Sequence, residues 1–513
     1  MATGTVASGA GSRLLRHLSM PRFVALVGLL AGMLEAHPQV TDPDFWWHLR
    51  NGNTMLATGR LIRLNPYAFI SVNHHWVLQE WLSEVWMAAA VAAGGRPAVV
   101  LGYWLVTLAM LLAIWARARV IAPVSGLTVG VGLFFAAFTA YPILGPRSQM
   151  ETYCLLAVTL LLVELQLRRG GLVAFWLGPV FLLWTDLEAG FIIGLIFLGA
   201  ILAAEVVSAA LGRRTRAEVQ SLARLGGASA CALAACLINP NGPAIVPYPF
   251  QTQFSSAQQA FILEWSSPDF HNPLLVALLL FILSLAYLLV RRRGLPLRDL
   301  VVLGLSLLVT LQSVRNLVIL VVAATPWWMV LADQVRGQLA QRWRLSLRPI
   351  QPLPVAVVEA VCLVGLMGWL GWQVTTQSSV ALASTTYTRP FPVCAAAWLM
   401  PGPGGLDIFN VYGDGGYLAY QLPRDKVYIF GDAALMGSNA LRRYASIVDL
   451  APGWLGRLNS SPSQVVLYNR GMPFSLALEG EPSWTLVYRD RGYEAFVRTS
   501  LLPHLRLPAP PTT

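Results

Sequence analysis

Long apolar runs recur along the first three quarters of the chain, and short arginine-bearing segments separate many of them. A run of about 20 apolar residues is long enough to cross a lipid bilayer as a helix. Eleven runs approach this length, and we interpret them as membrane spans at residues 21–38, 97–116, 120–141, 150–167, 171–187, 189–211, 218–238, 272–290, 297–314, 316–334 and 353–374. The pattern therefore predicts a mainly α-helical, polytopic membrane protein.

The pattern changes near residue 375. Short apolar runs bounded by glycine-rich turns are typical of strands, and they occur at 427–430, 465–468, 484–488 and 493–497 with helical stretches between them. This predicts a small α/β domain. We therefore expect three regions: a disordered cytoplasmic tail at 1–20, a transmembrane domain at 21–375, and an α/β domain at 376–513.

Arginine placement predicts the topology, because short cytoplasmic loops carry an excess of basic residues. Arginines gather in the loops at 117–119, 168–169, 213–216, 291–293 and 336–348. The N-terminus is then cytoplasmic, and the large first loop at 39–96 and the C-terminal domain are extracytoplasmic. This assignment requires the segment 77–94 to be a helix lying along the membrane surface rather than crossing it.

Composition supports this class. The chain of 513 residues is 56% hydrophobic and 12% charged, with a mean hydropathy of +0.58, whereas soluble domains carry about 25% charged residues. The net charge of +11 comes largely from loop arginines and does not predict a nucleic-acid partner. The five cysteines lack CxxC spacing, so neither a zinc site nor a disulfide framework is predicted.

The start of the first external loop carries the densest group of candidate chemistry. Asp42, Asp44, His48 and Arg50 lie together directly after the first predicted span, and ionisable groups at a membrane boundary mark functional sites. A carboxylate here can act as a general base or, paired with its neighbour, hold a divalent cation. His48 follows Asp44 by one helical turn and can orient it, and both His48 and Arg50 are candidates for substrate binding.

A structural role is the alternative. Thr41 or Asp42 can cap a helix running from about Phe45 to Thr58, with Asp44 stabilising its positive end.

Other external turns add candidates for substrate binding. Asp186 and Glu188 end the fifth predicted span, and Glu264 lies in a long external loop. Arg147 and Arg315 are the lone basic residues of their turns. A guanidinium binds phosphate oxygens in a fork, so a lipid phosphate is one partner for these arginines. A salt bridge to one of the three carboxylates is the other.

These motifs resemble a large group of bacterial polytopic membrane proteins that are similar to GT-C glycosyltransferases. That class includes protein O-mannosyltransferases and lipid A aminoarabinose transferases. The resemblance covers most of the chain, and its motifs are Asp42-Pro43-Asp44-Phe45-Trp46-Trp47-His48-Leu49, Glu80-Trp81-Leu82, Asn239-Pro240-Asn241-Gly242 and Tyr412-Gly413-Asp414-Gly415-Gly416-Tyr417.

The resemblance implies a hexosyl or pentosyl transferase in the bacterial inner (cytoplasmic) membrane. It would move a sugar from a polyprenyl-phosphate carrier to an envelope glycan, lipid or protein, with inversion. The base or metal ligand would be Asp42 or Asp44, with a slight preference for Asp42, and the donor phosphate would meet Arg147 or Arg315. No cofactor is implied with certainty beyond a possible divalent cation at these aspartates.

Two alternatives remain. One is a non-catalytic scaffold that binds a lipid-linked glycan. The other is a transporter, which is less favoured because the carboxylates lie at span ends rather than at the middle of the membrane.

Overall fold

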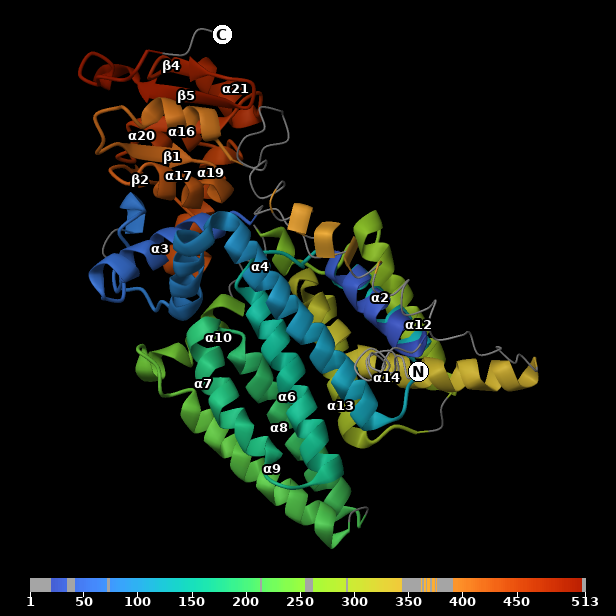
Figure 1. Cartoon of the computed structure of the whole chain (residues 1–513). Helices are drawn as coiled ribbons and strands as arrows, with labels where there is room; N and C mark the ends of the chain where they lie inside the picture. The colour runs from blue at the N-terminus through green and yellow to red at the C-terminus, as the bar shows by residue number, and fades with distance from the viewer. Residues whose placement is uncertain are drawn as a thin grey trace, which may run out of the picture.

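The computed structural model describes residues 20–34, 42–71, 74–212, 215–253, 262–291, 294–343 and 391–509, with scattered positions between 361 and 375. A helical bundle forms one part, and a C-terminal domain containing a sheet lies at one end of it (Figure 1). The predicted tail and most of the predicted span at 353–374 fall outside the described residues.

The predicted spans up to residue 334 each correspond to a helix. The helices of this part are α2 (Met20–Leu34), α3 (Phe45–Thr58), α4 (Trp81–Ile121), α5 (Gly126–Ala140), α6 (Gln149–Arg169), α7 (Leu177–Leu187), α8 (Phe191–Ala210), α9 (Arg216–Ala235), α10 (Tyr248–Gln253), α12 (Val276–Arg291), α13 (Leu297–Gln312) and α14 (Leu317–Arg342). Short 3-10 helices lie at Phe69–Ser71, Val173–Trp176, Gly242–Ile245, Leu263–Trp265, Pro273–Leu275 and Val314–Asn316.

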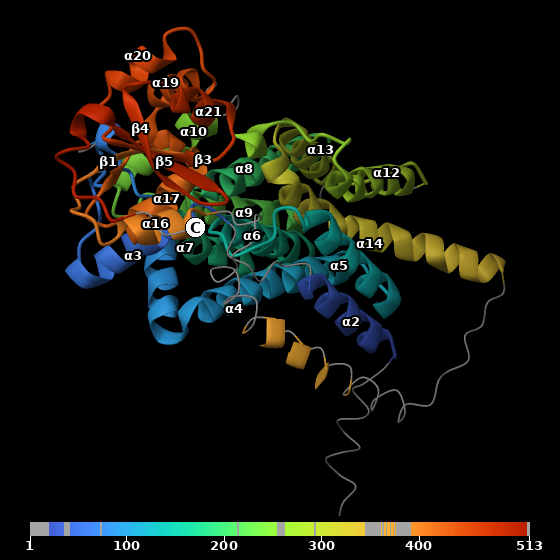
Figure 2. The ribbon, with the colours of Figure 1, turned by 90° about the horizontal axis from the view of Figure 1, so that it is seen from above.

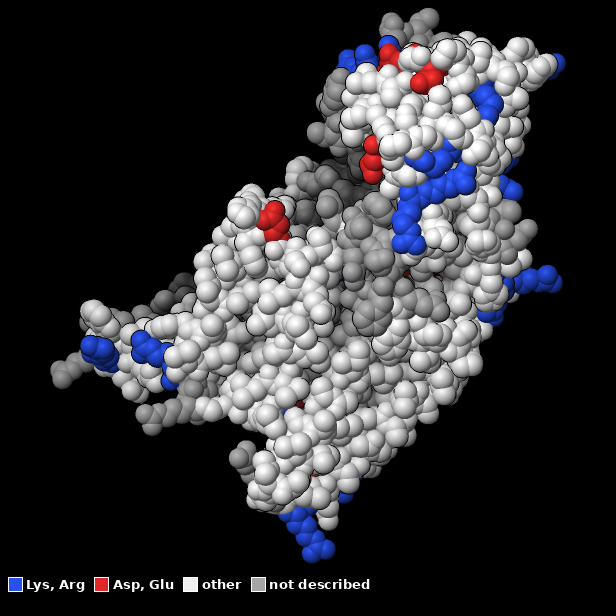
Figure 3. All heavy atoms as spheres, turned by 180° about the vertical axis from the view of Figure 1, so that it is seen from behind, with Lys and Arg blue, Asp and Glu red and all other residues white. Residues whose placement is uncertain are grey.

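Length and composition make five of the described helices able to cross a membrane: α4, α6, α8, and the continuous helical segments Pro273–Arg291 and Val314–Arg342. On the face shown in Figure 3, the side of the bundle carries few charged side chains, and Lys and Arg gather at its far end and on the C-terminal domain. The protein is therefore a multi-pass membrane protein of mainly helical fold, as the hydrophobic pattern predicted. The number of spans stays a prediction.

Helix α4 breaks at Gly94 and Gly95. Gly95 has φ 67° and ψ −166°, a conformation that only glycine adopts readily, and Figure 2 shows the helix axis turning there. The break lies between the predicted helix at 77–94 and the predicted span at 97–116, although the first helix begins at Trp81.

The C-terminal domain is built on a mixed five-stranded sheet of order β2-β1-β3-β5-β4. Its strands are β1 (Asp407–Asn410), β2 (Lys426–Val427), β3 (Val465–Asn469), β4 (Trp484–Arg489) and β5 (Tyr493–Arg498). Strand β1 pairs in parallel with β2 and β3, and β5 pairs antiparallel with β3 and β4. The helices are α16 (Val393–Leu399), α17 (Gly415–Gln421), α18 (Ala433–Met436), α19 (Ser438–Val448), α20 (Trp454–Asn459) and α21 (Pro473–Glu479), with short 3-10 helices at Tyr412–Asp414 and Thr499–Leu501.

The sheet confirms the predicted strands at 465–468, 484–488 and 493–497 and shortens the one at 427–430 to a two-residue pairing. Strand β1 was missed, because its four residues begin and end with polar side chains and form no apolar run.

The segment predicted to be the first external loop packs on the C-terminal domain. Val427 N donates to Tyr67 O at 2.9 Å, and Ala68 forms a parallel bridge with Val427. The ring of Trp46 lies edge-on to Tyr417, with centroids 5.1 Å apart. The loop and the domain therefore form one packed unit, with α3 directly beneath the domain (Figure 1).

Candidate active site

A cavity of about 710 Å³ lies where the bundle meets the C-terminal domain. The starts of α3 and α6, the turn between α7 and α8, and the segment 431–434 of the C-terminal domain contribute to its walls. The cavity brings together most of the site residues predicted from the sequence: Asp42, Asp44, His48, Arg147, Glu188, Glu264 and Arg315.

Helix α3 begins at Phe45 and ends at Thr58, as predicted, and Gly59 in the left-handed conformation follows its last residue. Asp42 Oδ1 accepts a hydrogen bond of 2.9 Å from the backbone N–H of Asp44, which supports the helix start. Asp44 makes no side-chain capping bond. The capping alternative therefore applies in part to Asp42, and Asp44 lies at the N-cap position, where a negative charge would stabilise the positive end of the helix. Thr41 lies outside the described residues.

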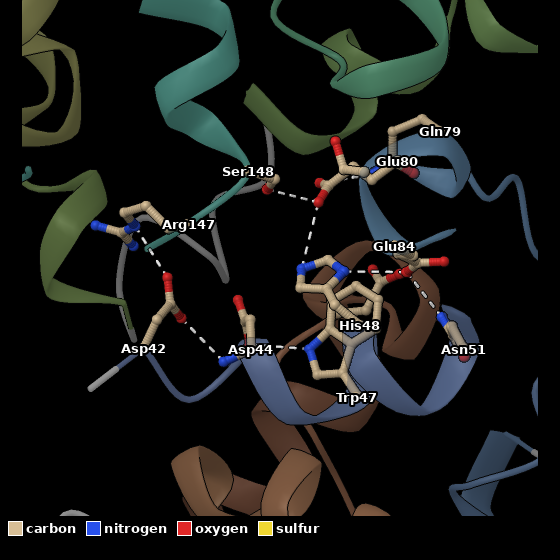
Figure 4. Close-up of polar contacts among 12 residues, drawn as sticks. Asp42, Asp44, Trp47, His48, Asn51, Gln79, Glu80, Glu84, Arg147 and Ser148 are labelled. Carbon is tan, nitrogen blue, oxygen red and sulfur yellow. Dashed lines mark hydrogen bonds and ion pairs between the residues drawn. The ribbon is translucent and has the colours of Figure 1, made fainter. Parts of the chain in front are cut away.

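Asp42 is committed to a salt bridge. Its Oδ2 lies 2.9 Å from Arg147 Nε, and Arg147 Nη2 lies 3.0 Å from Glu264 Oε1. Burial lowers the pKa of Arg147, but these two carboxylates outweigh burial and raise it overall. Figure 4 shows the ion pair with Asp42, and the ion pair with Glu264 realises the salt-bridge alternative for Arg147.

Asp44, unlike Asp42, has no arginine partner among the described residues. Its Oδ1 accepts from Trp47 Nε1 at 3.1 Å. Burial, followed by the charge of Asp42, raises the pKa of Asp44 from 3.8 to about 7, although His48 and Trp47 act in the opposite direction. A carboxylate with a pKa near neutrality can both take up and release a proton at working pH, which is typical of a general base.

His48 does not orient Asp44 by a hydrogen bond. Its Nδ1 lies 3.0 Å from Glu84 Oε1 and its Nε2 lies 3.3 Å from Glu80 Oε2, as Figure 4 shows. Burial lowers the pKa of His48, but Glu80 and Glu84 outweigh it and raise the pKa to about 9. A raised pKa favours the imidazolium form of His48 at neutral pH, and this form faces the carboxyl groups of Glu80 and Glu84.

Sequence reasoning missed this pairing. Glu80 and Glu84 lie four residues apart at the start of α4, a spacing that places both on one helix face. That spacing was the one sign in the sequence that the two glutamates act together. Nothing in the sequence indicated that they lie close to His48.

Arg315 differs from Arg147. Its guanidinium lies over the ring of Trp265, 5.2 Å from the centroid, and no described carboxylate lies within 4.0 Å of it. Glu188, also in the cavity, instead accepts hydrogen bonds from Thr152 Oγ1 and Gly190 N. Within the described part of the chain, the salt-bridge alternative therefore does not apply to Arg315.

The structure places Arg50 and Asp186 away from the cavity lining. Arg50 donates to Ala419 O, and to Pro423 O at 3.2 Å, and so ties α3 to the C-terminal domain. Asp186 accepts from Trp81 Nε1 at 2.8 Å and so ties α7 to α4. Both side chains join elements of the fold.

Asp432 joins the cavity from the C-terminal domain and was not a predicted site residue. Its Oδ2 accepts from Trp76 Nε1 at 2.7 Å, its Oδ1 accepts from Leu435 N at 2.9 Å, and Tyr248 OH lies 3.5 Å from Oδ1. Burial raises its pKa. No local pattern could place this residue beside α3, because the two segments lie at opposite ends of the chain.

A divalent cation would need several ligands from the side chains around the cavity. Among the described residues, no group of three or more His, Cys, Asp and Glu side chains is arranged to hold a metal ion. Divalent cations take several oxygen ligands, whereas Asp42 already faces the guanidinium of Arg147. Of the predicted pair, only Asp44 keeps a carboxylate oxygen without a hydrogen-bond or ion-pair partner among the described residues, so a cation held by both aspartates does not fit this arrangement.

The sequence matches no protein-family model and no curated protein. Solved structures do match. The oligosaccharyltransferase AglB from Archaeoglobus fulgidus, in complex with an inhibitory peptide and a dolichol-phosphate, aligns with a TM-score of 0.54 at 10% identity, over 93% of this chain and 74% of that chain. The oligosaccharyltransferase from the same organism, tethered to an acceptor peptide containing the NVT sequon, aligns with a TM-score of 0.53 at 13% identity over the same shares. The protein has the GT-C fold.

ArnT from Cupriavidus metallidurans, bound to undecaprenyl phosphate, aligns with a TM-score of 0.45 at 15% identity, over 96% of this chain and 98% of that chain. The assignment of the GT-C fold rests on the two archaeal structures. It confirms the resemblance drawn from the motifs.

Proposed function

We propose that this GT-C protein is a glycosyltransferase that moves a sugar from a polyprenyl-phosphate carrier to an envelope glycan, lipid or protein. The reaction would take place on the extracytoplasmic face of a bacterial inner membrane. One observation carries the proposal: the same cavity holds Asp44, with a pKa of about 7, and Arg315, which has no described carboxylate partner. The similarity to AglB, whose structure contains a dolichol-phosphate, supports the class of carrier.

Arg315 would bind the phosphate of the donor. A guanidinium donates paired hydrogen bonds to phosphate oxygens, and its charge stabilises the negative charge that collects there as the bond to the sugar breaks. Apolar side chains of α8 line the same cavity, among them Ile192, Ile193 and Ile196. They offer a surface against which the start of the isoprenoid chain can lie.

Asp44 would act as the general base. Its carboxylate takes the proton of the acceptor hydroxyl while the hydroxyl oxygen attacks the anomeric carbon on the face opposite the phosphate. The new glycosidic bond forms as the bond from carbon to phosphate oxygen breaks, and the polyprenyl phosphate leaves with that electron pair. A single displacement inverts the anomeric configuration, and protonated Asp44 then returns its proton to water.

Transfer by the purified protein in detergent tests the proposal. A panel of radiolabelled polyprenyl-phosphate sugars is offered with envelope extract as the acceptor, and movement of label to a new product is measured. We expect transfer from one donor, its loss in Asp44→Asn, and its retention in Asp449→Asn, which makes the same change at an exposed residue of the C-terminal domain. Carrier binding without transfer across the panel would favour the non-catalytic scaffold. The absence of both binding and transfer would refute the proposal.

A further inference from the structure

The carboxylate of Asp44 packs against the backbone of Gly431 in the C-terminal domain. A methyl group added to Gly431 would overlap Asp44 Oδ1 and lie 2.6 Å from its Cγ and 3.2 Å from its Oδ2. Gly431 is not among the residues with positive φ. A glycine is therefore required here because a side chain would collide with Asp44, and not because of the backbone conformation.

Gly431 is itself fixed by its surroundings. Its carbonyl oxygen accepts from Tyr412 OH at 2.9 Å and from Ala433 N at 2.8 Å. The next residue, Asp432, accepts from Trp76 Nε1 at 2.7 Å. The backbone at Gly431 and Asp432 therefore cannot move away from Asp44 without breaking several of these hydrogen bonds.

Asp44 Oδ1, the atom that a methyl group on Gly431 would overlap, is also held from within the helix of Asp44. Trp47 donates to Asp44 Oδ1 at 3.1 Å, and the ring of Trp47 contacts Phe430, with centroids 5.8 Å apart. The residue that precedes Gly431 thus touches the side chain that holds Asp44.

We propose that the C-terminal domain sets the position of the Asp44 carboxylate through Gly431, which makes Gly431 a positioning residue. The reactive role of Asp44 rests on the proposed function, whereas its contact with Gly431 does not. The domain would then be part of the active site.

Gly431→Ala tests this inference. The added methyl meets the end of a flexible side chain rather than backbone, so the fold can persist while the carboxylate moves. Since a misplacement of about 1 Å can lower a rate about 100-fold, we expect kcat to fall about 10- to 100-fold with little change in KM for the donor, which Arg315 would hold elsewhere. The matched control is Gly456→Ala in α20, where an added methyl meets nothing within 4 Å, and its kcat should stay at the wild-type level.

A second readout needs no activity. The difference in thermal stability between Asp44 and Asp44→Asn proteins, followed from pH 4 to pH 9, reports the titration of Asp44. In the Gly431→Ala background this titration should move to lower pH, because the methyl pushes the carboxylate toward the open cavity and reduces the burial that raises its pKa.

A lowered kcat together with a shifted titration supports the inference. An unchanged titration overturns it, and so does a shifted titration with unchanged kcat. If the wild-type protein transfers no sugar, the proposed function fails, and the titration alone decides whether Gly431 positions Asp44. If Gly431→Ala does not fold, adding Asp44→Ala removes the overlap, so recovery of the fold supports the contact and continued misfolding overturns it.

Discussion

Replacing Asp44 by asparagine should abolish transfer and at the same time stabilise the protein at alkaline pH. Asp44 has its pKa raised from 3.8 to about 7 by burial and by Asp42. Between these values the folded protein holds a proton that the unfolded chain has lost. The contribution of Asp44 to stability therefore falls as pH rises from about 4 to about 7 and is constant above that.

The magnitude follows from the shift. One pKa unit corresponds to about 1.4 kcal/mol, so a shift of roughly three units sets an upper limit of about 4 kcal/mol. Asp44 is only partly buried, because it faces the cavity, and solvent screening reduces this value. We expect Asp44→Asn to be more stable than the wild type by about 1–2 kcal/mol at pH 8 and equally stable at pH 4.

Thermal unfolding in detergent at pH 4, 6 and 8 measures this difference, with Asp449→Asn as the exposed control. The control should show no gain in stability at pH 8. An Asp44→Asn protein that is less stable than the wild type at pH 8, or that retains transfer, would refute the assignment of Asp44 as a general base with a raised pKa.

Three further predictions concern the rest of the site. Arg315→Lys keeps the charge but loses the paired N–H donors that bind two phosphate oxygens, so KM for the donor should rise about tenfold. An unchanged KM would contradict the proposal that Arg315 binds the donor phosphate. Asp42→Asn should reduce kcat far less than Asp44→Asn, because Asp42 is bound to Arg147; equal losses in the two variants would show that both carboxylates are needed. The pKa of His48 is raised from 6.5 to about 9, so its stabilising charge is fully present below about pH 6.5 and is lost as pH rises through about 9. His48→Gln should flatten that part of the profile of stability against pH and destabilise the protein by about 3–5 kcal/mol at pH 6, which thermal scans from pH 6 to 10 would measure.

The sequence by itself determined the class of this protein. A bilayer needs long apolar runs whatever the fold, so the helices that correspond to the runs up to residue 334 could be placed from hydropathy alone. Helix α3 was placed correctly, since its boundaries follow local signals: a polar turn before Phe45 and Gly59 after Thr58. The strands β3, β4 and β5 were also found from local signals, namely short apolar runs bounded by turns.

The tertiary structure alone decided which predicted groups remain available for chemistry. The sequence favoured Asp42 slightly over Asp44, but Arg147 from a distant turn neutralises Asp42, and Gly431 from the C-terminal domain packs against Asp44. Arg50, adjacent in sequence to these groups, is drawn away to backbone carbonyls of the C-terminal domain. Hydrophobic periodicity records only local burial, whereas the pairing of charges depends on which distant segments meet, and packing of the whole chain sets that.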